Sequence, residues 1–195
     1  MKYTKYLIYV FKLRLRAIRY FFCSFSIKKK IIAKGGRVLG KVDFQIDGNL
    51  EVGDNVILSG DGIDNKTYTQ IQVARNASLK IGTMSGCSQV SISCKDKVDI
   101  GNYVNIGAGS LIIDSNHHST YWKDHEDRGV DARNARTAPV VIEDYVFIGA
   151  RSIVCKGVRI GSRSIIAAGS VVVSNIPSDC IAGGNPCKVI KKINQ

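Results

Sequence analysis

The stretch VVIEDYVFIGARSIVCKGVRIGSRSIIAAGSVV, residues 140–172, decides the fold because it repeats every six residues. Aliphatic side chains recur at this interval without a miss, at Ile142, Ile148, Val154, Ile160, Ile166 and Val172. A second row, made of valine and serine, lies two residues before each of these positions, at Val140, Val146, Ser152, Val158, Ser164 and Ser170. Neither an α-helix nor a half-buried strand produces this spacing, since their periods are about 3.6 and about 2 residues.

A period of six requires a unit that combines a short strand with a sharp bend, so that the aliphatic residue points inward each time. Three such units close a triangular coil of about 18 residues, and coils of this kind stack as a solenoid. Small residues follow the aliphatic position in IGA (148–150), IGS (160–162) and IAA (166–168). They permit backbone bends that larger residues disfavour.

The same period appears upstream of this stretch. Two rows are clear, and a third is weaker because its last member is polar: Ile46, Val52 and Leu58; Ile100, Ile106 and Ile112; Val73, Leu79 and Ser85. The repeat therefore covers about residues 38–113 and 140–173, with interruptions near 60–70 and at 114–139.

The charge of the chain is concentrated at its N-terminus. The net charge is +12 over 195 residues, but residues 1–30 hold nine of the 28 basic side chains and none of the 16 acidic ones. The other 165 residues hold 19 basic and 16 acidic side chains, which argues against a nucleic-acid partner for the domain. The six cysteines have no metal-binding spacing, and we expect reduced thiols in a cytoplasmic protein.

Residues 1–30 have the pattern of an amphipathic helix. On a helical wheel, five basic residues share one side (Lys2, Lys5, Lys12, Arg16, Arg19) and five apolar residues share another (Leu7, Phe11, Ile18, Phe22, Phe25). Four basic residues within 7–27 argue against a membrane span, at about 2.5–3.5 kcal/mol each. We expect a helix at the surface of the inner membrane face, with packing on the protein or a partner subunit as the alternative.

Residues 139–193 resemble the C-terminal half of hexapeptide-repeat acyltransferases. The resemblance is most specific in IGARSIV, IAAGSVV and AGGNPCKVI, and it extends over about 38–193. Its nearest group is the maltose and galactoside O-acetyltransferases, with the related enzymes that acetylate bacterial polysaccharides. It implies an all-β fold, a left-handed parallel β-helix over residues 31–195, with the N-terminal α-helix at 1–30 and an extruded loop at 114–139. It also implies a homotrimer that binds acetyl-CoA between adjacent β-helices and needs no metal.

The loop 114–139 holds all three histidines and the only tryptophan. Transfer of an acyl group to a hydroxyl needs a base, and imidazole, with a pKa of about 6.5, is suited to this task. The family places its base at this junction, in motifs that both His117 and His118 satisfy with Asp114. Counting from the preceding IGA unit favours His117, whereas the following serine favours His118. Asp114 is the local candidate to hold the other ring nitrogen, with a backbone carbonyl or an acid of the next subunit as alternatives. His125 is expected to be solvated.

The resemblance implies further contacts. Ala150 and Ala168 border the pantetheine arm of CoA, and Val173 and Ser174 lie near its distal part. Lys188 and Lys191 meet its phosphates, with a solvated tail as the alternative. Ser88 and Gln89 present polar groups to the acceptor. Trp122 forms a wall for a sugar or for CoA, or else packs within the loop.

These residues predict a CoA-dependent O-acetyltransferase that moves an acetyl group directly to a sugar or glycan hydroxyl. The nearest alternative is an N-acetyltransferase that acts on an amino sugar. A zinc hydratase would need three histidine ligands shared across subunits. A catalytically inactive trimeric scaffold is the remaining alternative.

Overall fold

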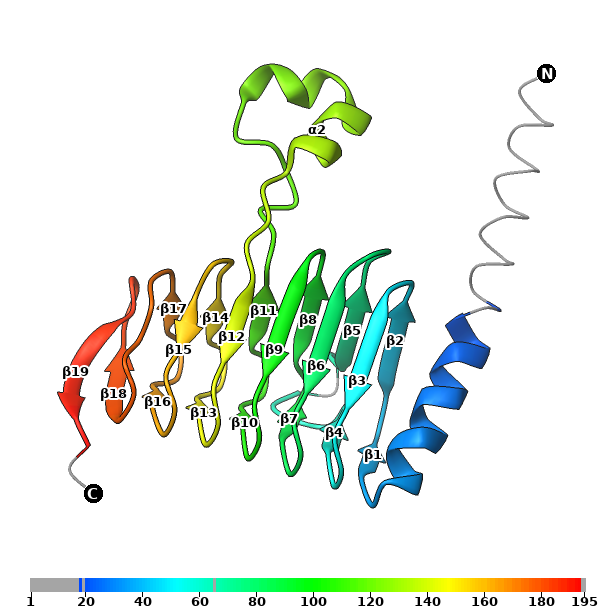
Figure 1. The fold of residues 1–195 in the computed structure, drawn as a ribbon, viewed down its shortest axis with the longest axis vertical. Helices are drawn as coiled ribbons and strands as arrows, with labels where there is room; N and C mark the ends of the chain where they lie inside the picture. The colour runs from blue at the N-terminus through cyan, green and yellow to red at the C-terminus, as the bar shows by residue number, and fades with distance from the viewer. Residues whose placement is uncertain (1–17, 19, 65, 194–195) are drawn as a thin grey trace.

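The computed structural model describes residues 18, 20–64 and 66–193, which form a parallel β-helix with three flat faces (Figure 1). Each coil contributes one short strand to each face, so strands that neighbour one another in a sheet come from successive coils. The pairing is parallel throughout, except that the last strand, β19, runs antiparallel to β18. The all-β solenoid expected from the six-residue period is confirmed.

The three faces are named sheets A, B and C. Sheet A contains β1 (Arg37–Leu39), β4 (Ile57–Ser59), β7 (Gly86–Ser88), β10 (Asn105–Ile106), β13 (Phe147–Ile148), β16 (Ile165–Ile166), β18 (Cys180–Gly183) and β19 (Lys188–Lys192). Sheet B contains β2 (Val42–Ile46), β5 (Thr69–Val73), β8 (Ser91–Cys94), β11 (Leu111–Ile113), β14 (Ile153–Val154) and β17 (Val171–Val172). Sheet C contains β3 (Asn49–Val52), β6 (Ser78–Ile81), β9 (Lys97–Ile100), β12 (Val140–Ile142) and β15 (Arg159–Ile160).

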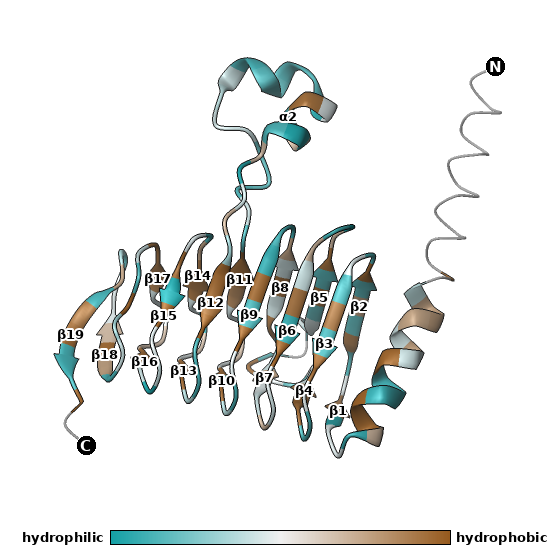
Figure 2. Cartoon of the chain, in the orientation of Figure 1, coloured by the Kyte–Doolittle hydropathy of each residue, from teal (hydrophilic) through white to brown (hydrophobic). Residues whose placement is uncertain are grey.

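The core is the stack of inward side chains. Figure 2 colours the strands by hydropathy, and hydrophobic positions (brown) recur along them. All six aliphatic positions of the row 142–172 are at most 1% exposed. The valines and serines of the second row are buried as well. Their hydroxyls are satisfied by backbone carbonyls of the bends: Ser152 Oγ donates to Gly149 O at 2.8 Å and Ser164 Oγ to Pro177 O at 2.7 Å.

Upstream, two of the three rows expected from the sequence, the row that begins with Ile46 and the row that begins with Val73, combine residues that do not align with one another in the stacked coils. The register aligns Leu79 with Leu50, and Ile81 with Val52, so Leu79 belongs to the second row and Ile81 to the first. In sheet B, Phe44 aligns with Ile71, whereas Ile46 aligns with Val73. The strict six-residue count fails here because the first coils carry additional residues in longer strands and bends.

Glycine after the aliphatic residue is required by the close stacking of coils. A Cβ atom on Gly149 would lie 2.5 Å from the backbone nitrogen of Ala168, and one on Gly107 would lie 2.5 Å from that of Ala150. Real Cβ atoms do not approach a backbone nitrogen this closely. The IGA units at 106–108 and 148–150 therefore set the spacing of consecutive bends.

An N-terminal helix, described at residue 18 and over residues 20–33, lies at the end of the stack beside β1 and β2 (Figure 1). It packs on the core through Ile27 and Ile31, and Tyr20 donates a hydrogen bond of 2.8 Å to Asp47. Gly35, at φ +76°, ends it in a Schellman motif, since Gly35 and Gly36 donate to the carbonyls of Ile32 and Ile31.

The helix extends three residues past the expected boundary at residue 30, and the division into residues 1–30 and 31–195 stays a prediction. The basic residues Lys2, Lys5, Lys12, Arg14, Arg16 and Arg19 lie outside the described residues. Within 18, 20–64 and 66–193, no helix has the length and apolar character to cross a membrane.

The six cysteines are free thiols, as expected. Four of them, Cys87, Cys94, Cys180 and Cys187, are buried with the aliphatic residues. Burial raises the pKa of the Cys87 and Cys94 thiols to about 12, so these residues act as small apolar side chains.

Replacing one inward aliphatic side chain tests the core. We expect Ile166→Ala to lower the free energy of unfolding by about 2–5 kcal/mol, because it leaves a cavity between stacked coils. Ile165→Ala, on the outward side of the same strand, is the matched control and should cost clearly less. Chemical denaturation followed by circular dichroism measures both, and equal losses would contradict the assigned inward row.

Candidate functional site

The site is built on the loop 114–139, which leaves the β-helix between β11 of sheet B and β12 of sheet C (Figure 1). Its two ends form a narrow stalk. Ser115 and Thr137 form an antiparallel bridge, and the Asn116 N–H donates to Arg136 O at 3.0 Å. The Ala138 N–H donates to Asp114 O at 2.9 Å. Because these bonds pair the loop's backbone, it projects as a defined arm.

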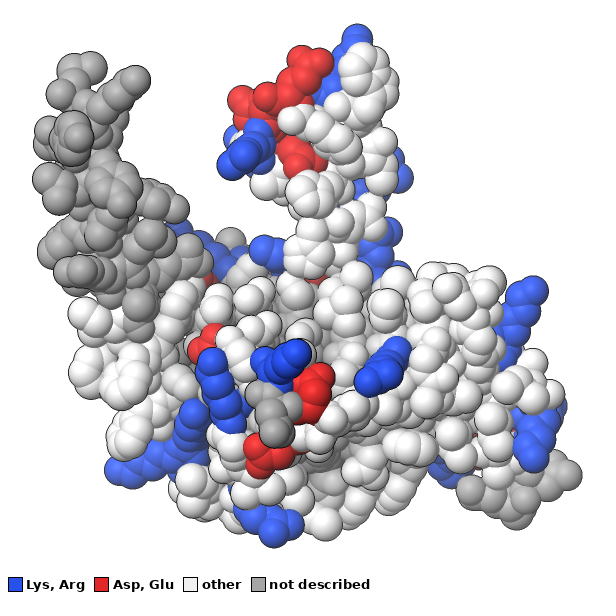
Figure 3. Space-filling model, turned by 180° about the vertical axis from the view of Figure 1, so that it is seen from behind, with Lys and Arg blue, Asp and Glu red and all other residues white. Residues whose placement is uncertain are grey.

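The head of the arm consists of a 3₁₀ helix, η1 (Trp122–Glu126), and a short α-helix, α2 (Arg128–Asn134). Asp127 caps α2, since its side chain accepts hydrogen bonds from the backbone of Gly129 and Val130. Acidic and basic side chains gather on this head (Figure 3). The sequence between the stalk strands therefore folds locally, with polar contacts in place of a core.

His118 and Asp131 form the central pair of the head. His118 Nδ1 lies 2.6 Å from Asp131 Oδ2, and the Ser119 N–H donates to Asp131 Oδ1 at 2.7 Å. These two hydrogen bonds hold the pKa of Asp131 below its ordinary value, so its carboxylate is ionised at neutral pH. An ionised carboxylate only accepts, which places the proton on Nδ1 of neutral His118 and leaves the lone pair of Nε2 free.

The surroundings of this pair fix its geometry. Asp131 is buried, whereas the His118 side chain is 73% exposed. The ring is therefore held at Nδ1 by Asp131, and most of its surface is accessible to solvent. Ser119 Oγ donates to Asp124 at 2.6 Å, and Asn134 donates to the same carboxylate oxygen at 2.8 Å. His125 Nε2 lies 2.9 Å from the carbonyl of Ser119. His125, expected to be solvated, thus also braces the segment that carries His118.

His117 has a different environment. It lies in the left-handed backbone region, at φ +62°, and its N–H donates to Ser115 Oγ at 3.0 Å. Partial burial of the ring, and then the nearby Lys95 ammonium, hold the pKa of His117 below its ordinary value. The lowered pKa favours the neutral form of His117, but the buried carboxylate of Asp131 contacts His118 and not His117.

Asp114 does not have the place that the sequence analysis gave it. Its side chain is fully buried, and its two oxygens accept hydrogen bonds of 2.8 Å from the backbone N–H groups of Lys95 and Asp96. Asp114 therefore fixes the neighbouring bend to the foot of the arm. The acceptor on the His118 ring is Asp131 instead.

The β-helix has the shape of a three-sided prism, with an edge wherever two of its sheets meet. Four of the residues expected near CoA lie on two different edges of this prism. Val173 and Ser174 follow β17 on the edge between sheets B and C, which is also the edge where the arm leaves. Ala150 and Ala168 lie in consecutive bends on the edge between sheets A and B, joined by the Gly169 N–H to Ala150 O bond of 2.8 Å. Lys188 and Lys191 are exposed on β19. One chain therefore does not bring Ala150 and Ala168 to the same edge as the arm.

Gln89, expected to contact an acceptor, instead uses its side-chain amide to hold the loop near 60–68. Its amide is 3% exposed; the oxygen accepts from Ile63 N–H at 2.5 Å, and the nitrogen donates to the carbonyls of Asp64 and Thr67. Ser88 is half-buried and lines a groove of about 250 Å³ on sheet A, together with Asn105 and Phe147.

Trp122 opens η1 and is 66% exposed. Its ring lies 6.3 Å from that of Tyr121, and the Lys123 ammonium lies 5.5 Å from its centroid. Packing within the loop does not cover it, so its outer face is available to a ligand.

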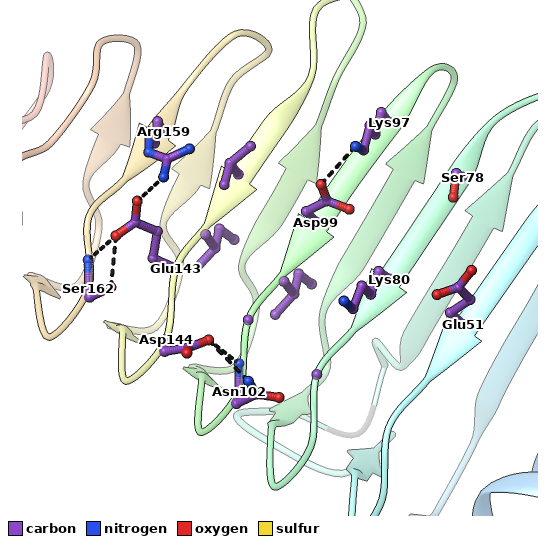
Figure 4. A pocket seen from close by; sticks show the side chains of 15 residues that line it. Glu51, Ser78, Lys80, Lys97, Asp99, Asn102, Glu143, Asp144, Arg159 and Ser162 are labelled. Atoms are coloured by element: carbon purple, nitrogen blue, oxygen red, sulfur yellow. Dashed lines mark hydrogen bonds and ion pairs between the residues drawn. The ribbon is translucent and has the colours of Figure 1, made fainter.

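A larger groove, of about 680 Å³, runs over the outer face of sheet C (Figure 4). None of the expected site residues lines it. Four of its charged groups form two ion pairs: Lys97 with Asp99 at 3.1 Å, and Arg159 with Glu143. Among the described residues, no group of three His, Cys, Asp or Glu side chains is arranged to hold a metal ion.

Sequence reasoning missed Asp131 and Asp124, the two carboxylates that organise the head. They lie 13 and 6 residues after His118 without any repeat to mark them. The only signal was the number of acidic residues in a segment that also holds every histidine.

Comparison with known proteins shows which proteins share this architecture. Residues 139–174 match the family model described as the hexapeptide repeat of succinyl-transferase. A hexapeptide-repeat acetyltransferase of Vibrio cholerae, crystallised with acetyl-CoA, is 30% identical over 60% of this chain and 61% of that chain, with a TM-score of 0.54. The chain has the left-handed β-helix fold of hexapeptide-repeat acetyltransferases. The resemblance seen in the sequence is confirmed.

Two further relatives differ in the group that they acetylate. A maltose O-acetyltransferase of Clostridium difficile is 27% identical over 78% of this chain and 71% of that chain, with a TM-score of 0.53. A 2,3,4,5-tetrahydropyridine-2,6-dicarboxylate N-acetyltransferase of Staphylococcus aureus is 45% identical over 58 residues, which are 30% of this chain and 24% of that enzyme. The match thus spans about a quarter of this curated relative.

Acid should loosen the arm before the β-helix. The folded head lowers the pKa of Asp124, Asp127 and Asp131 through hydrogen bonds, so the unfolded head binds more protons. Their stabilising contribution is present above the ordinary pKa of about 3.9 and is lost as the pH falls through the lowered values. Fluorescence of Trp122, the only tryptophan, should change below about pH 4 while the β signal in circular dichroism persists.

Asp124→Asn is the variant for this test, and Asp99→Asn, in sheet C, is its control. The first should flatten the pH dependence of Trp122 fluorescence and the second should leave it unchanged. Identical acid profiles for all three proteins would show that the carboxylates do not hold the head together.

Proposed function

We propose that this protein is a CoA-dependent acetyltransferase that moves the acetyl group of acetyl-CoA to a sugar or glycan hydroxyl. The observation that carries the proposal is the pair of His118 and Asp131 on an arm of a hexapeptide-repeat β-helix. The acetyl-CoA complex of the Vibrio cholerae protein supports the donor, and the maltose O-acetyltransferase supports a sugar acceptor.

His118 is the proposed general base. Asp131 holds the proton on Nδ1, so Nε2 takes the proton of the attacking hydroxyl. The hydroxyl oxygen forms a bond to the thioester carbonyl carbon, and the tetrahedral intermediate then collapses with cleavage of the C–S bond. The imidazolium returns its proton to the leaving thiolate. No covalent enzyme intermediate is needed, and Asp131 stabilises the charged ring between the two proton transfers.

A homotrimer completes the proposed site. Ala150 and Ala168 lie on a different edge from the arm, so an adjacent copy is needed to bring its bends beside His118. The distal part of CoA is proposed to contact Val173 and Ser174, which lie on the same edge as the arm. Its phosphates are proposed to contact Lys188 and Lys191 on β19. Trp122 is the proposed wall for the acceptor.

The cytoplasmic side of a membrane is the proposed setting. Nine basic and no acidic side chains in residues 1–30 favour an anionic surface, and a lipid-linked saccharide is the acceptor class that such a setting supplies. N-acetylation of an amino sugar is the second candidate, since the Staphylococcus aureus relative, which is 45% identical over 58 residues, is an N-acetyltransferase.

Replacement of the base tests the mechanism. We expect His118→Ala to lower acetyl transfer by about 10²–10⁴-fold, because it removes the proton acceptor, while binding of acetyl-CoA is retained. His117→Ala is the matched control and should have a much smaller effect. Release of CoA thiol measures the rate, and calorimetry measures binding. Full activity of His118→Ala, or loss of activity in His117→Ala alone, would exclude His118 as the base.

The acceptor atom can be identified directly. Labelled acetyl-CoA is offered with a panel of neutral sugars, amino sugars and membrane extracts, and the labelled product is treated with mild alkali. We expect the label to be released, because an O-acetyl ester is cleaved under conditions that an N-acetyl amide survives. A product that keeps its label would favour the N-acetyltransferase alternative.

A further inference from the structure

The N-terminal helix has two apolar faces, and only one of them is covered. Tyr20, Ile27 and Ile31 lie on the side that packs against the first coil. On the opposite side, five large apolar side chains are exposed by 54–70%: Ile18, Phe21, Phe22, Phe25 and Ile32. At 100° per residue, these five fall within an arc of about 100°. This outward stripe is not accounted for by the packing of the β-helix.

Basic residues accompany the outward stripe. Lys28, Lys29 and Lys30 belong to the same helix, and Lys29 and Lys30 are exposed. The chain has no acidic residue before Asp43, and residues 1–42 hold twelve lysines and arginines. An apolar stripe with three lysines near the C-terminal end of its helix fits a surface that is apolar inside and anionic outside.

We infer that the outward stripe of this helix docks on the surface of an anionic lipid bilayer. Phe21, Phe22 and Phe25 enter the boundary between headgroups and acyl chains, and the three lysines meet lipid phosphates. A second copy of the chain is the less suitable occupant, since pairing two such helices would bring two lysine runs and two acid-free N-terminal segments together.

The same contact orients the molecule. The helix lies across the end of the first coil, so its outward stripe faces away from the stack, and the axis of the β-helix stands on the membrane. The arm leaves after β11, three coils above β2 in sheet B. At about 4.8 Å per coil, this places the foot of the arm about 14 Å above the first coil. With a helix about 10 Å thick in between, the foot lies roughly 25 Å above the lipid.

This distance, which rests on the proposed function, gives a class of acceptor. A reacting hydroxyl roughly 25 Å from the lipid belongs to an extended headgroup, such as an oligosaccharide on a lipid carrier, rather than to a single sugar attached directly to the lipid.

Vesicle binding tests the docking without any use of the acetyl-transfer reaction. The full-length protein is centrifuged with vesicles of phosphatidylcholine alone and of phosphatidylcholine mixed with phosphatidylglycerol. We expect binding to the anionic vesicles only. The double variant Phe21→Ser, Phe25→Ser should weaken that binding at least about tenfold, and Leu39→Ser, Ile63→Ser, which removes two other exposed apolar side chains, should leave it unchanged.

The cationic part has its own pair of variants. Lys28→Gln, Lys29→Gln, Lys30→Gln should weaken binding strongly, whereas Lys66→Gln, Lys80→Gln, Lys156→Gln, with the same change in net charge, should have little effect. Circular dichroism and light scattering accompany each variant. Absence of wild-type binding to anionic vesicles, or equal binding by the phenylalanine variant, overturns the proposal. A smaller oligomer in the phenylalanine variant, without vesicle binding by the wild type, would assign the stripe to a second copy.

Discussion

Burial of one aliphatic side chain in every six residues is the interaction on which the rest of this structure depends. Each inward residue of the row 142–172 aligns with its counterpart in a neighbouring coil, and each is nearly inaccessible to solvent. Because the row is continuous, an insertion is tolerated only at a bend, where no inward residue is displaced. The arm leaves at such a bend, and Asp114 fastens its foot to the neighbouring coil through two backbone N–H groups. The scaffold thus determines where the histidines emerge.

The regular part of the chain is predictable from sequence for the same physical reason. A side chain that must point inward in every unit leaves a period, and the period defines strands, bends and coil size together. Where bends lengthen, the count is lost: Leu79 was placed in the first row, although the register puts Ile81 there. The inward serines of the second row interrupt the apolar pattern in the sequence. They are nevertheless buried at the expected positions, because their hydroxyls donate hydrogen bonds to backbone carbonyls of the bends. Handedness has no sequence period and came only from resemblance.

The position of the arm could be predicted from the sequence, but the contacts within its head could not. Its head depends on individual contacts between residues far apart in the segment, such as the Asp131 carboxylate that binds both the His118 ring and the Ser119 N–H. A hydrogen-bonded head without a core has no periodicity, so the sequence offered the nearest carboxylate, Asp114, as the local candidate to orient the ring, beside a backbone carbonyl or an acid of the next subunit. Asp114 and Asp131 are both buried, yet the more distant Asp131 contacts the His118 ring, so proximity in sequence to a histidine is a weak guide to its partner.

The separation of the elements on the prism limits what a single chain can do. The arm and the bends at Ala150 and Ala168 occupy different edges, and backbone hydrogen bonds hold both the stalk of the arm and these bends in place. A reaction that needs both must therefore draw on a neighbouring copy. In the proposed trimer, the residues that hold the arm in place matter as much as His118, the proposed base. A displaced stalk would move His118 away from the proposed site, to which its own chain contributes only in part. Asp114, the local candidate from the sequence for holding the ring of the base, instead fixes the foot of the arm.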